Sequence, residues 1–212
     1  MSYASVSTPL ESGGYMTAVS NSAAGGSNNV LLRLDDNGDT LWTKEYPVSN
    51  IHYPRSIAQD LWGNVLIIGH YDIPVTNWSD EVYYLRVDTL GNLIDNGNLT
   101  NSGNSTWTYP TGGLEIAYDS TYIIGFRGWG LSSNNSNLRK YNSTFNVQWS
   151  RTFGISYTMN NFIENSDNSL IMVGEGYAQF SSVRNGRIFK INENNGFIYF
   201  KDYKFPGAAH SY

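Results

Sequence analysis

One pattern of residues recurs four times along this chain of 212 residues. Each copy has a polar turn, a short apolar run, a polar gap, a second apolar run and a further polar turn. The copies read GGYMTAV and VLLRLDDNGDTLW, GNVLIIGHY and VYYLRVDTLGNLI, DSTYIIGFR and LRKYNSTFNVQW, and NSLIMVGEG and IFKINENNGFIY. The equivalent positions Leu34, Val87, Tyr141 and Ile191 recur roughly every 50 residues, a period typical of a repeat unit that holds about four strands.

The second copy shows the strands of one unit most clearly, since RSIAQD, NVLIIGHY, EVYYLRVD and NLIDNGNL follow one another between residues 55 and 99. Aromatic residues make up 15% of the chain, and Asn, Ser, Thr and Gly crowd the gaps, a combination that favours an all-β fold. By the same template, the other copies predict strands at 4–8, 15–20, 29–35 and 40–46, at 114–118, 121–127, 136–142 and 147–153, and at 161–165, 170–175, 186–192 and 197–203.

The distribution of apolar residues predicts how these units pack. The second strand of a copy, such as VLIIG or LIMVG, is apolar on both faces, as expected of a strand between two neighbouring sheets. The third strand alternates, so Leu32 and Leu34 are expected on one face and Arg33 on the other, partly toward solvent. A unit with two apolar faces cannot stand alone. The sequence therefore predicts an all-β β-propeller of four repeats, each a four-stranded antiparallel blade.

The repeat also predicts the domain organisation. No linker or shift of composition divides the chain, so we expect a single β-propeller domain over residues 1–212, with blades at approximately 4–53, 54–109, 110–157 and 158–212. Two architectures fit four whole copies. One is a closed four-bladed ring, and the other is half of a seven- to eight-bladed ring completed by further blades on the same chain or by a second subunit.

Composition excludes several classes of partner. Charged residues make up 15% of the chain, the formal net charge is −5, and Lys and Arg occur singly, so a nucleic-acid partner is not expected. No apolar run approaches the length of a membrane helix, and the N-terminal residues lack the pattern of a secretory signal. Cysteine is absent, which removes disulfides and thiolate sites. No cofactor is predicted.

The segment SGGYMTAV followed by VLLRLDDNGDTLWTKEY resembles the propeller repeats of secreted and cell-surface Bacteroidetes proteins, many of them exported through the type IX secretion system. The matching residues are Gly13, Gly14, Tyr15, Leu34, Asp35, Gly38 and Trp42, and then Gly63, Gly69, Val87, Asp88 and Gly91. Later copies depart from the pattern, with Phe145 and Asn195 in place of glycine and Asp95 and Tyr199 in place of tryptophan. The resemblance implies a non-catalytic module, extracellular or on the cell surface, and part of a larger protein.

The same resemblance implies two possible sites of modification. Asp88-Thr89-Leu90 and Asp119-Ser120-Thr121 look like the O-glycosylation acceptor sequence of that phylum, with Thr89 and Ser120 as the acceptors. Asp-Thr and Asp-Ser are also ordinary turn dipeptides, so both interpretations stay open.

Metal sites are not predicted. The segment 35–39, DDNGD, begins like a calcium loop, but Thr40 stands where an EF-hand needs glycine and Tyr46 where it needs glutamate. A hairpin turn explains the segment better. His52, His70 and His210 lie in different contexts, and packing explains them better than a shared metal.

A glycosidase is the alternative to a binding module, because propeller folds host sugar hydrolysis by paired carboxylates. The possible members are Asp72, Asp80, Glu81, Glu115 and Glu175. None of them sits in a motif that fixes a separation, and no nucleophile or phosphate motif occurs, so the sequence leads us to expect no enzyme and no catalytic residue.

Four aromatic residues in or beside polar loops are the candidate ligand contacts: Tyr71, Trp78, Trp107 and Trp129. Flat rings stack on sugars or on apolar partner surfaces, whereas the structural alternative is that they cover the contacts between blades. The leading hypothesis is a non-catalytic binding or scaffold module that recognises a glycan or a protein through these residues. The alternatives are a purely structural spacer and a propeller-type glycoside hydrolase.

Overall fold

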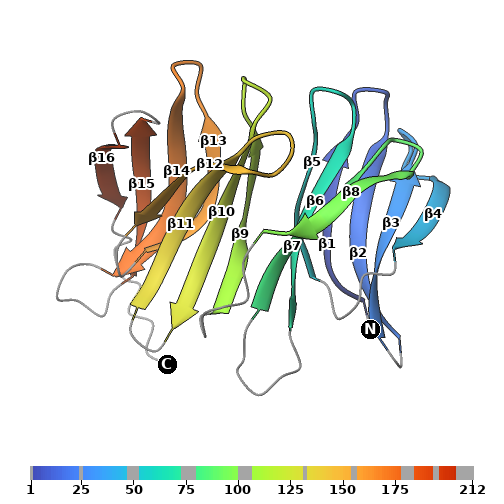
Figure 1. Ribbon diagram of the computed structural model, residues 1–212, viewed down its shortest axis with the longest axis horizontal. Helices are drawn as coiled ribbons and strands as arrows, with labels where there is room; N and C mark the ends of the chain where they lie inside the picture. Colours follow the sequence, from blue (N-terminus) through green and yellow to red (C-terminus); the bar gives the residue numbers. More distant parts are fainter. Residues whose placement is uncertain are drawn as a thin grey trace. The chain divides into compact units, whose positions relative to one another are not determined.

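The computed structural model describes residues 2–23, 26–46, 53–72, 80–99, 107–130, 133–153, 157–177, 184–192 and 196–203. Over these ranges the chain forms sixteen β-strands and no helix (Figure 1). A helix able to cross a membrane is accordingly not found among these residues. The prediction of an all-β fold is confirmed.

The strands form four antiparallel sheets, each made of four strands that follow one another in the chain. The first sheet contains β1 (Ser2–Pro9), β2 (Tyr15–Ala23), β3 (Gly26–Leu34) and β4 (Thr40–Tyr46). The second contains β5 (Tyr53–Gln59), β6 (Val65–Asp72), β7 (Asp80–Val87) and β8 (Leu93–Asn98). The third contains β9 (Trp107–Ile116), β10 (Tyr122–Gly130), β11 (Ser133–Tyr141) and β12 (Val147–Phe153). The fourth contains β13 (Tyr157–Glu164), β14 (Ser169–Tyr177), β15 (Arg184–Asn192) and β16 (Gly196–Tyr203).

Every strand expected from the repeat overlaps an observed one, and β9 differs most. It begins at Trp107, seven residues before the expected start, because Pro110 and Gly113 read as strand breakers in the sequence. Gly113 is needed in this strand for a close approach, since a Cβ atom there would lie 2.4 Å from the ring of Phe162. Glycine in a strand therefore marks a contact between sheets here rather than a strand end.

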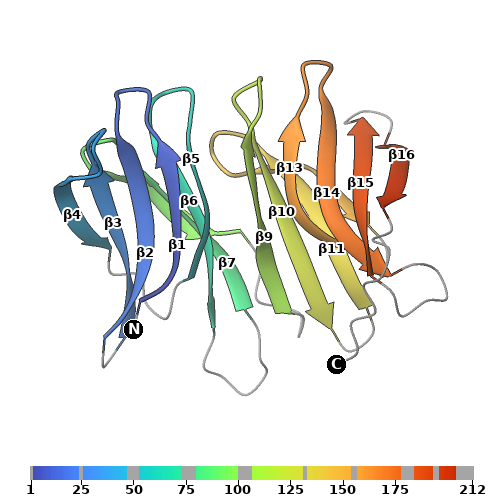
Figure 2. The same cartoon turned by 180° about the vertical axis from the view of Figure 1, so that it is seen from behind.

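The chain divides into two compact units, Met1–Pro110 and Thr111–Tyr212. The first unit holds the first and second sheets, and the second unit holds the third and fourth sheets apart from the first residues of β9. In the first unit β5 lies beside β1 and β2, and in the second unit β13 lies beside β10 and β11 (Figure 2). The single domain, its blade boundaries and the closure of a ring stay predictions.

The core of the first unit is centred on β6. Val65, Leu66, Ile67 and Ile68 have no exposed surface, so this strand is buried on both faces, as its apolar sequence predicted. One face joins a cluster that also contains residues of β2, β3 and β7: Met16, Ala18, Leu31, Leu85 and Val87. Burial of each such side chain stabilises the unit by about 1.5–3 kcal/mol.

The core of the second unit joins β10 and β11 to the fourth sheet. Ile123 and Leu138 pack in one cluster with Met159, Leu170, Phe189 and other apolar residues. In β14, however, Leu170 is buried whereas Val173 is 43% exposed. β14 therefore departs from the prediction of burial on both faces, and so does β2, where Tyr15 is also 43% exposed.

Arg33 corrects the expected orientation of the third strand. Leu31 is fully buried and Arg33 is 9% exposed, so the buried face of β3 is the one that carries the arginine. The guanidinium donates hydrogen bonds to the carbonyl oxygens of Gly13 (2.7 Å) and Leu34. A charged group is tolerated there because backbone carbonyls satisfy its donors.

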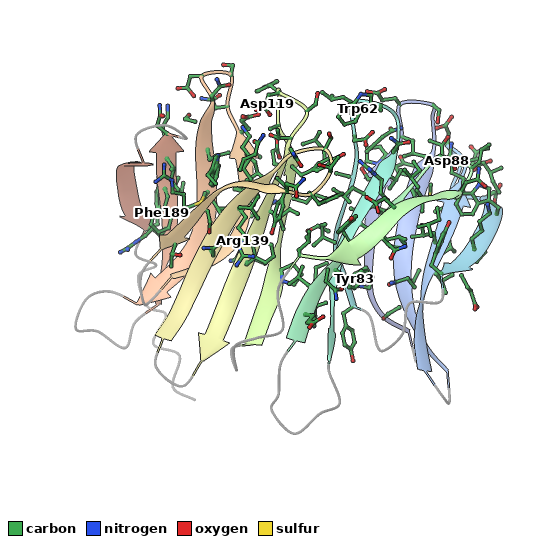
Figure 3. All side chains as sticks on the ribbon, in the orientation of Figure 1. Trp62, Tyr83, Asp88, Asp119, Arg139 and Phe189 are labelled. Carbon is green, nitrogen blue, oxygen red and sulfur yellow. The ribbon has the colours of Figure 1, made fainter. Side chains whose placement is uncertain are left out.

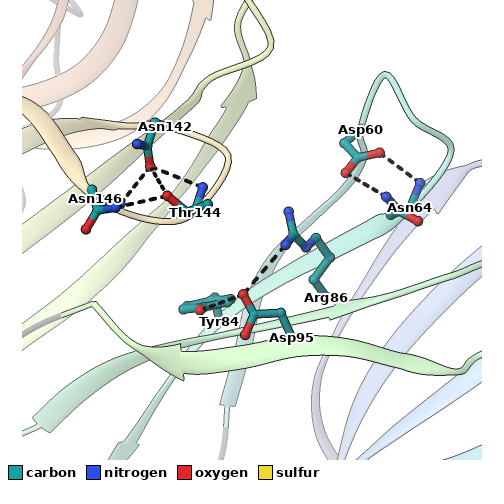
Figure 4. Close-up of polar contacts among 8 residues, drawn as sticks. All are labelled: Asp60, Asn64, Tyr84, Arg86, Asp95, Asn142, Thr144 and Asn146. Atoms are coloured by element: carbon teal, nitrogen blue, oxygen red, sulfur yellow. Dashed lines mark hydrogen bonds and ion pairs between the residues drawn. The ribbon is translucent and has the colours of Figure 1, made fainter.

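Seven described turns share one hydrogen-bond pattern. The N–H of the first residue donates to the carbonyl of the fifth, and the N–H of the fourth donates to the carbonyl of the first. The turns begin at Leu10, Asp35, Asp60, Asp88, Ala117, Asn142 and Asn165. In four of them, including those of Asp60 and Asn142 (Figure 4), the Oδ1 atom of the first residue also accepts from the N–H of the third and fifth residues. The prediction that residues 35–39 form a hairpin turn is confirmed.

The fourth residue of each of these turns has a left-handed backbone. In the first unit it is always glycine, with φ between 75° and 87°. In the second unit it is Ser120, Phe145 or Asn168, with φ between 57° and 63°. The repeat thus keeps the turn while it loses the glycine, which explains why the pattern weakens along the sequence.

Candidate functional site

The strands of each sheet run between two opposite ends of the sheet, and different connections lie at each end. We refer to these ends as edges. The seven tight turns lie at one edge, which we call the turn edge, and the connections between second and third strands leave from the other, which we call the loop edge. Three of the predicted aromatic residues lie in strand segments at loop edges: Tyr71 near the end of β6, Trp129 near the end of β10 and Trp107 at the start of β9. Their side chains, and all of Trp78, lie outside the described residues.

The loop edge of the second sheet brings together three of the five predicted carboxylate residues. In the β6–β7 register, Asp72 is opposite Asp80 and Tyr71 is opposite Glu81. Trp78 belongs to the segment that joins these two strands. One aromatic and three acidic residues therefore occupy two consecutive positions of the ladder.

Glu115 and Glu175 do not belong to this group. Glu115 lies near the end of β9, at the turn edge of the third sheet, and Glu175 lies in β14 opposite Gly186. Glu81 is the one member of the loop-edge group whose side chain is described: it is 6% exposed, and its Oε2 atom accepts a hydrogen bond of 2.9 Å from Asn98 Nδ2.

His70 lies one residue before Tyr71 and is 3% exposed. Its ring stacks on the ring of Tyr53 with centroids 5.1 Å apart. Arg55 Nε donates to His70 Nδ1 over 3.4 Å, so the neutral imidazole carries its proton on Nε2. His52 and His210 lie outside the described residues, and no cluster of three or more metal-ligating side chains occurs among the residues described.

A buried polar contact joins the two sheets of the first unit on the loop-edge side. The hydroxyl of Tyr83, which is labelled in Figure 3, donates to Asn29 Oδ1 over 2.9 Å. Burial raises the pKa of Tyr83. Gly69 makes room for this hydroxyl, because a Cβ atom at Gly69 would lie 2.5 Å from it. Sequence reasoning missed this contact, because the two residues belong to different copies and only the packing of the two sheets brings them together.

On β8, Asp95 takes the place that tryptophan has in the first copy. Its Oδ2 atom accepts from the Tyr84 hydroxyl (3.0 Å) and lies 3.6 Å from Arg86 Nη2 (Figure 4). Burial, followed by the hydrogen bond to Asp95, raises the pKa of Tyr84 to about 12. The aromatic residue of the repeat is thus replaced by a polar network.

At the turn edge, the two sheets of each unit are joined by a side chain that the sequence did not single out. Gln59 Oε1 accepts from the backbone N–H of Glu11 (2.8 Å), and Glu164 Oε2 accepts from the backbone N–H of Tyr118 (2.7 Å). Both acceptors immediately precede the first residue of a tight turn. That position in the repeat is the signal by which they could have been found.

Glu164 also faces Glu115. Burial raises the pKa of Glu115, the backbone N–H of Glu164 opposes this by hydrogen bonding to the carboxylate, and the Glu164 charge raises it further. The Glu164 carboxylate accepts from the backbone of the third sheet, and the Glu164 N–H donates to the Glu115 carboxylate. These two hydrogen bonds join the sheets of the second unit at the turn edge, opposite the predicted ligand residues.

The two predicted glycosylation residues lie in turns. Thr89 is the second residue of the turn that begins at Asp88 and is half-buried, and Ser120 is the left-handed fourth residue of the turn that begins at Ala117. Their modification stays a prediction.

No protein-family model matches the sequence, and no curated protein matches it either. Solved structures do share the fold. An endo-arabinase from Bacteroides thetaiotaomicron VPI-5482 is 19% identical, with a TM-score of 0.56 over 96% of this chain and 77% of that chain. A glycosyl hydrolase from Bacteroides ovatus is 10% identical, with a TM-score of 0.51 over 95% of this chain and 71% of that chain. The chain therefore has a propeller-like all-β fold that Bacteroides proteins also use.

These similarities correct one prediction. The sequence led us to expect that the chain is not an enzyme, yet two proteins with this fold are an endo-arabinase and a glycosyl hydrolase. A structural repeat without a catalytic motif is therefore no argument against glycosidase activity, because a fold supplies only the scaffold and activity depends on the residues of a site.

Proposed function

We propose that this protein binds a glycan at the loop edge of its second sheet, through Tyr71, Trp78 and the acidic residues Asp72, Asp80 and Glu81. The observation that carries the proposal is the register of β6 and β7, in which Tyr71 is opposite Glu81 and Asp72 is opposite Asp80. Aromatic rings stack on the faces of sugars, and carboxylates accept hydrogen bonds from sugar hydroxyls. The glycan-acting enzymes of similar fold support this class of ligand.

Glycoside hydrolysis is the second candidate function. It is favoured by the opposition of Asp72 and Asp80, since glycosidases work with two carboxyl groups of unequal pKa. In a glycosidase pair one carboxyl group is protonated and the other is ionised. The protonated group can then serve as the acid and the ionised one as nucleophile or base.

The test is titration of the full chain with a panel of oligosaccharides that includes arabino-oligosaccharides, followed by assay of the same panel for cleavage. We expect Tyr71→Ala to weaken binding at least tenfold. The matched control is Tyr15→Ala, because Tyr15 begins β2 at the turn edge and is 43% exposed. If both substitutions weaken binding equally, or if no sugar binds, the proposed glycan site is rejected. The alternative of a purely structural spacer is then favoured.

Cleavage has its own variants. Asp72→Asn and Asp80→Asn each remove one carboxylate with little change of size, and Asp36→Asn, at the exposed turn edge of the first sheet, is the control. A loss of cleavage in both loop-edge variants that is much larger than their loss of binding would support hydrolysis. Equal cleavage by all three variants would reject this pair as the catalytic one.

We further propose that the four sheets are blades of a propeller in a secreted or cell-surface protein, with Thr89 and Ser120 as glycosylation acceptors and with tryptophans Trp107 and Trp129 as additional contacts to a glycan or protein. The repeat and its resemblance to surface propeller modules support this. Sedimentation would distinguish a four-bladed monomer from two halves of a larger ring. Mass spectrometry of the protein from its native source would detect sugar on either acceptor.

A further inference from the structure

The second unit has two arginines in the seam between its sheets, meaning the space filled by Ile123, Leu138, Met159 and Phe189. Arg127 follows Ile123 by four residues on β10, and Arg187 precedes Phe189 by two residues on β15. Side chains alternate along a strand, so both arginines project toward the seam. Both lie between this apolar cluster and the loop edges of their sheets.

The first unit shows how these positions meet. Residues of different copies are equivalent when they lie at the same distance from equivalent turns or opposite equivalent residues in the ladder. On this basis Arg127 corresponds to Ser20, Ser136 to Asn29 and Arg187 to Tyr83. In the first unit Tyr83 reaches across the seam to Asn29, with 2.9 Å between the hydroxyl and Oδ1. By this correspondence we expect Arg187 to face Ser136 across the seam, and Arg127 is the register partner of Ser136 on β10.

Ser136 lies at the seam by direct contact. It is 1% exposed, and its hydroxyl oxygen accepts from the backbone N–H of Met159, on β13 of the opposite sheet, over 3.3 Å. Arg127 is the register partner of this serine on the third sheet, and Arg187 holds the equivalent of the Tyr83 position on the fourth, so we infer that both guanidinium groups face this part of the seam.

The polar side chains of this seam can donate hydrogen bonds to an anion. Arg187 is 6% exposed, with its guanidinium 5.7 Å from the ring centroid of Phe189. Arginine stays charged when it is buried and binds planar oxyanions through two parallel hydrogen bonds. The Thr111 hydroxyl is also buried in this seam, close to Gly125 and Met159, and has no hydrogen-bond partner in the described part of the chain.

We propose that this seam binds the carboxylate or sulfate group of an acidic saccharide, with Arg127 and Arg187 as the anion contacts and Thr111 as a further donor. The site is separate from the sugar site on the second sheet, and the sugar part of its ligand rests on the proposed function. Charge favours a saccharide over nucleic acid, because the net charge of −5 opposes a long phosphate backbone.

Asp202 is the acidic residue nearest this site in the ladder. It is opposite Arg187 in the β15–β16 register, and its side chain lies outside the described residues. Register partners share one face of a sheet, so we expect the charge of this residue to oppose an acidic ligand at Arg187.

The test is calorimetric titration of the full chain with oligogalacturonate and with a sulfated disaccharide, at low and high salt, against a neutral arabino-oligosaccharide. We expect acidic sugars to bind in a salt-sensitive manner. Arg127→Ser and Arg187→Tyr introduce the residues of the first unit at these positions, and each should weaken binding of acidic sugars at least tenfold. Lys201→Ser, which removes an exposed charge from β16, should have an effect of less than twofold.

Each outcome decides between the proposals. Equal losses in Arg127→Ser and Lys201→Ser would overturn the site, because attraction would then be diffuse. Absence of binding by acidic sugars, or tighter binding of single-stranded RNA, would overturn the ligand class. Asp202→Asn should leave affinity unchanged or raise it, and a loss would overturn the expected effect of the Asp202 charge. Failure of Tyr71→Ala to affect neutral sugars rejects only the site on the second sheet.

Discussion

Gln59 and Glu11 join the two sheets of the first unit, with 2.8 Å between the Gln59 Oε1 atom and the backbone nitrogen of Glu11. Glu164 and Tyr118 repeat this relationship in the second unit at the same positions of the repeat. At the corresponding positions of β1 and β9 the residues are Pro9 and Ile116, whose side chains have no acceptor. Each unit therefore has this side-chain hydrogen bond from its second sheet to its first, and the first sheet has no equivalent acceptor side chain.

The first prediction concerns this link. Gln59→Ala should lower the free energy of unfolding by about 1 kcal/mol, because the N–H of Glu11 and the carbonyl of Gly63 each lose a hydrogen-bond partner. Glu164→Gln should cost less, since the amide keeps an acceptor oxygen. Urea denaturation measures both, with Gln148→Ala, at an exposed residue of β12, as the control. A loss in the control equal to that in Gln59→Ala would contradict the prediction.

The second prediction concerns the left-handed turn position. Ser120→Gly should raise the free energy of unfolding by up to about 1 kcal/mol, because φ is 63° at Ser120 and a left-handed backbone is strained for any residue with a Cβ atom. Phe145→Gly should have the opposite effect, since the Phe145 ring stacks on Tyr122 with centroids 5.0 Å apart. Thermal and urea unfolding check the two signs.

Gly38→Ala is the reverse control for the turn. No atom lies within 4 Å of the added Cβ, so any loss of stability reports the backbone conformation alone, at a φ of 87°. We expect a loss of about 1 kcal/mol. An unchanged free energy of unfolding would show that the left-handed backbone of this turn is not strained by a Cβ atom, and would contradict the prediction.

The third prediction concerns pH. Burial raises the pKa of Glu115 above its ordinary value in the folded chain, so folding favours the protonated carboxyl group. Its contribution to stability is complete below the unfolded pKa and is lost as the pH rises through the folded pKa. Glu115→Gln should therefore reduce the decline in stability as the pH rises above the ordinary glutamate pKa of about 4.3. Urea midpoints at a series of rising pH values measure the difference, and parallel curves for the two proteins would refute the assignment.

The fourth prediction concerns Gly69. Gly69→Ala should destabilise the first unit by about 1–3 kcal/mol, since the new methyl group would lie 2.5 Å from the Tyr83 hydroxyl and 2.6 Å from the Tyr53 carbonyl oxygen. Tyr83→Phe removes only the first of these clashes. In a double-mutant cycle, the combined loss should thus be smaller than the sum of the single losses. A strictly additive cycle would show that the contacts kept in Tyr83→Phe dominate, namely those of the Tyr53 carbonyl oxygen and the Cε1 atom of the ring at residue 83, each 2.6 Å from the added Cβ.

The sequence predicted the sheets because turn chemistry and strand pattern recur in register. Asp35, Asp60, Asp88 and Asn142 each use a side-chain oxygen to fix a turn, and that requirement is local enough to be read from spacing. The burial of Arg33 was not predictable in this way. A charged residue in an alternating strand is predicted to face solvent. That prediction changes only when the carbonyl oxygens that accept its hydrogen bonds are known.

The candidate sites show a similar limit. The sequence identified Tyr71, Asp72 and Asp80 as separate candidates, and only the register of β6 and β7 joins them at one edge. The Arg127 and Arg187 pair required a further step, because the two residues are related through the contact of Tyr83 with Asn29 in the other unit. Contacts between sheets depend on the packing of repeats, which composition and spacing do not encode.

The separation of the two edges allows the loop-edge connections to vary independently of the turns. The fixed turns are at one edge, whereas the connections between second and third strands leave from the other and range from two residues, at 24–25, to seven, at 73–79. New sequences can be placed in these connections without touching a single turn hydrogen bond. A library built on residues 73–79 would thus vary recognition while the architecture beneath it stays constant.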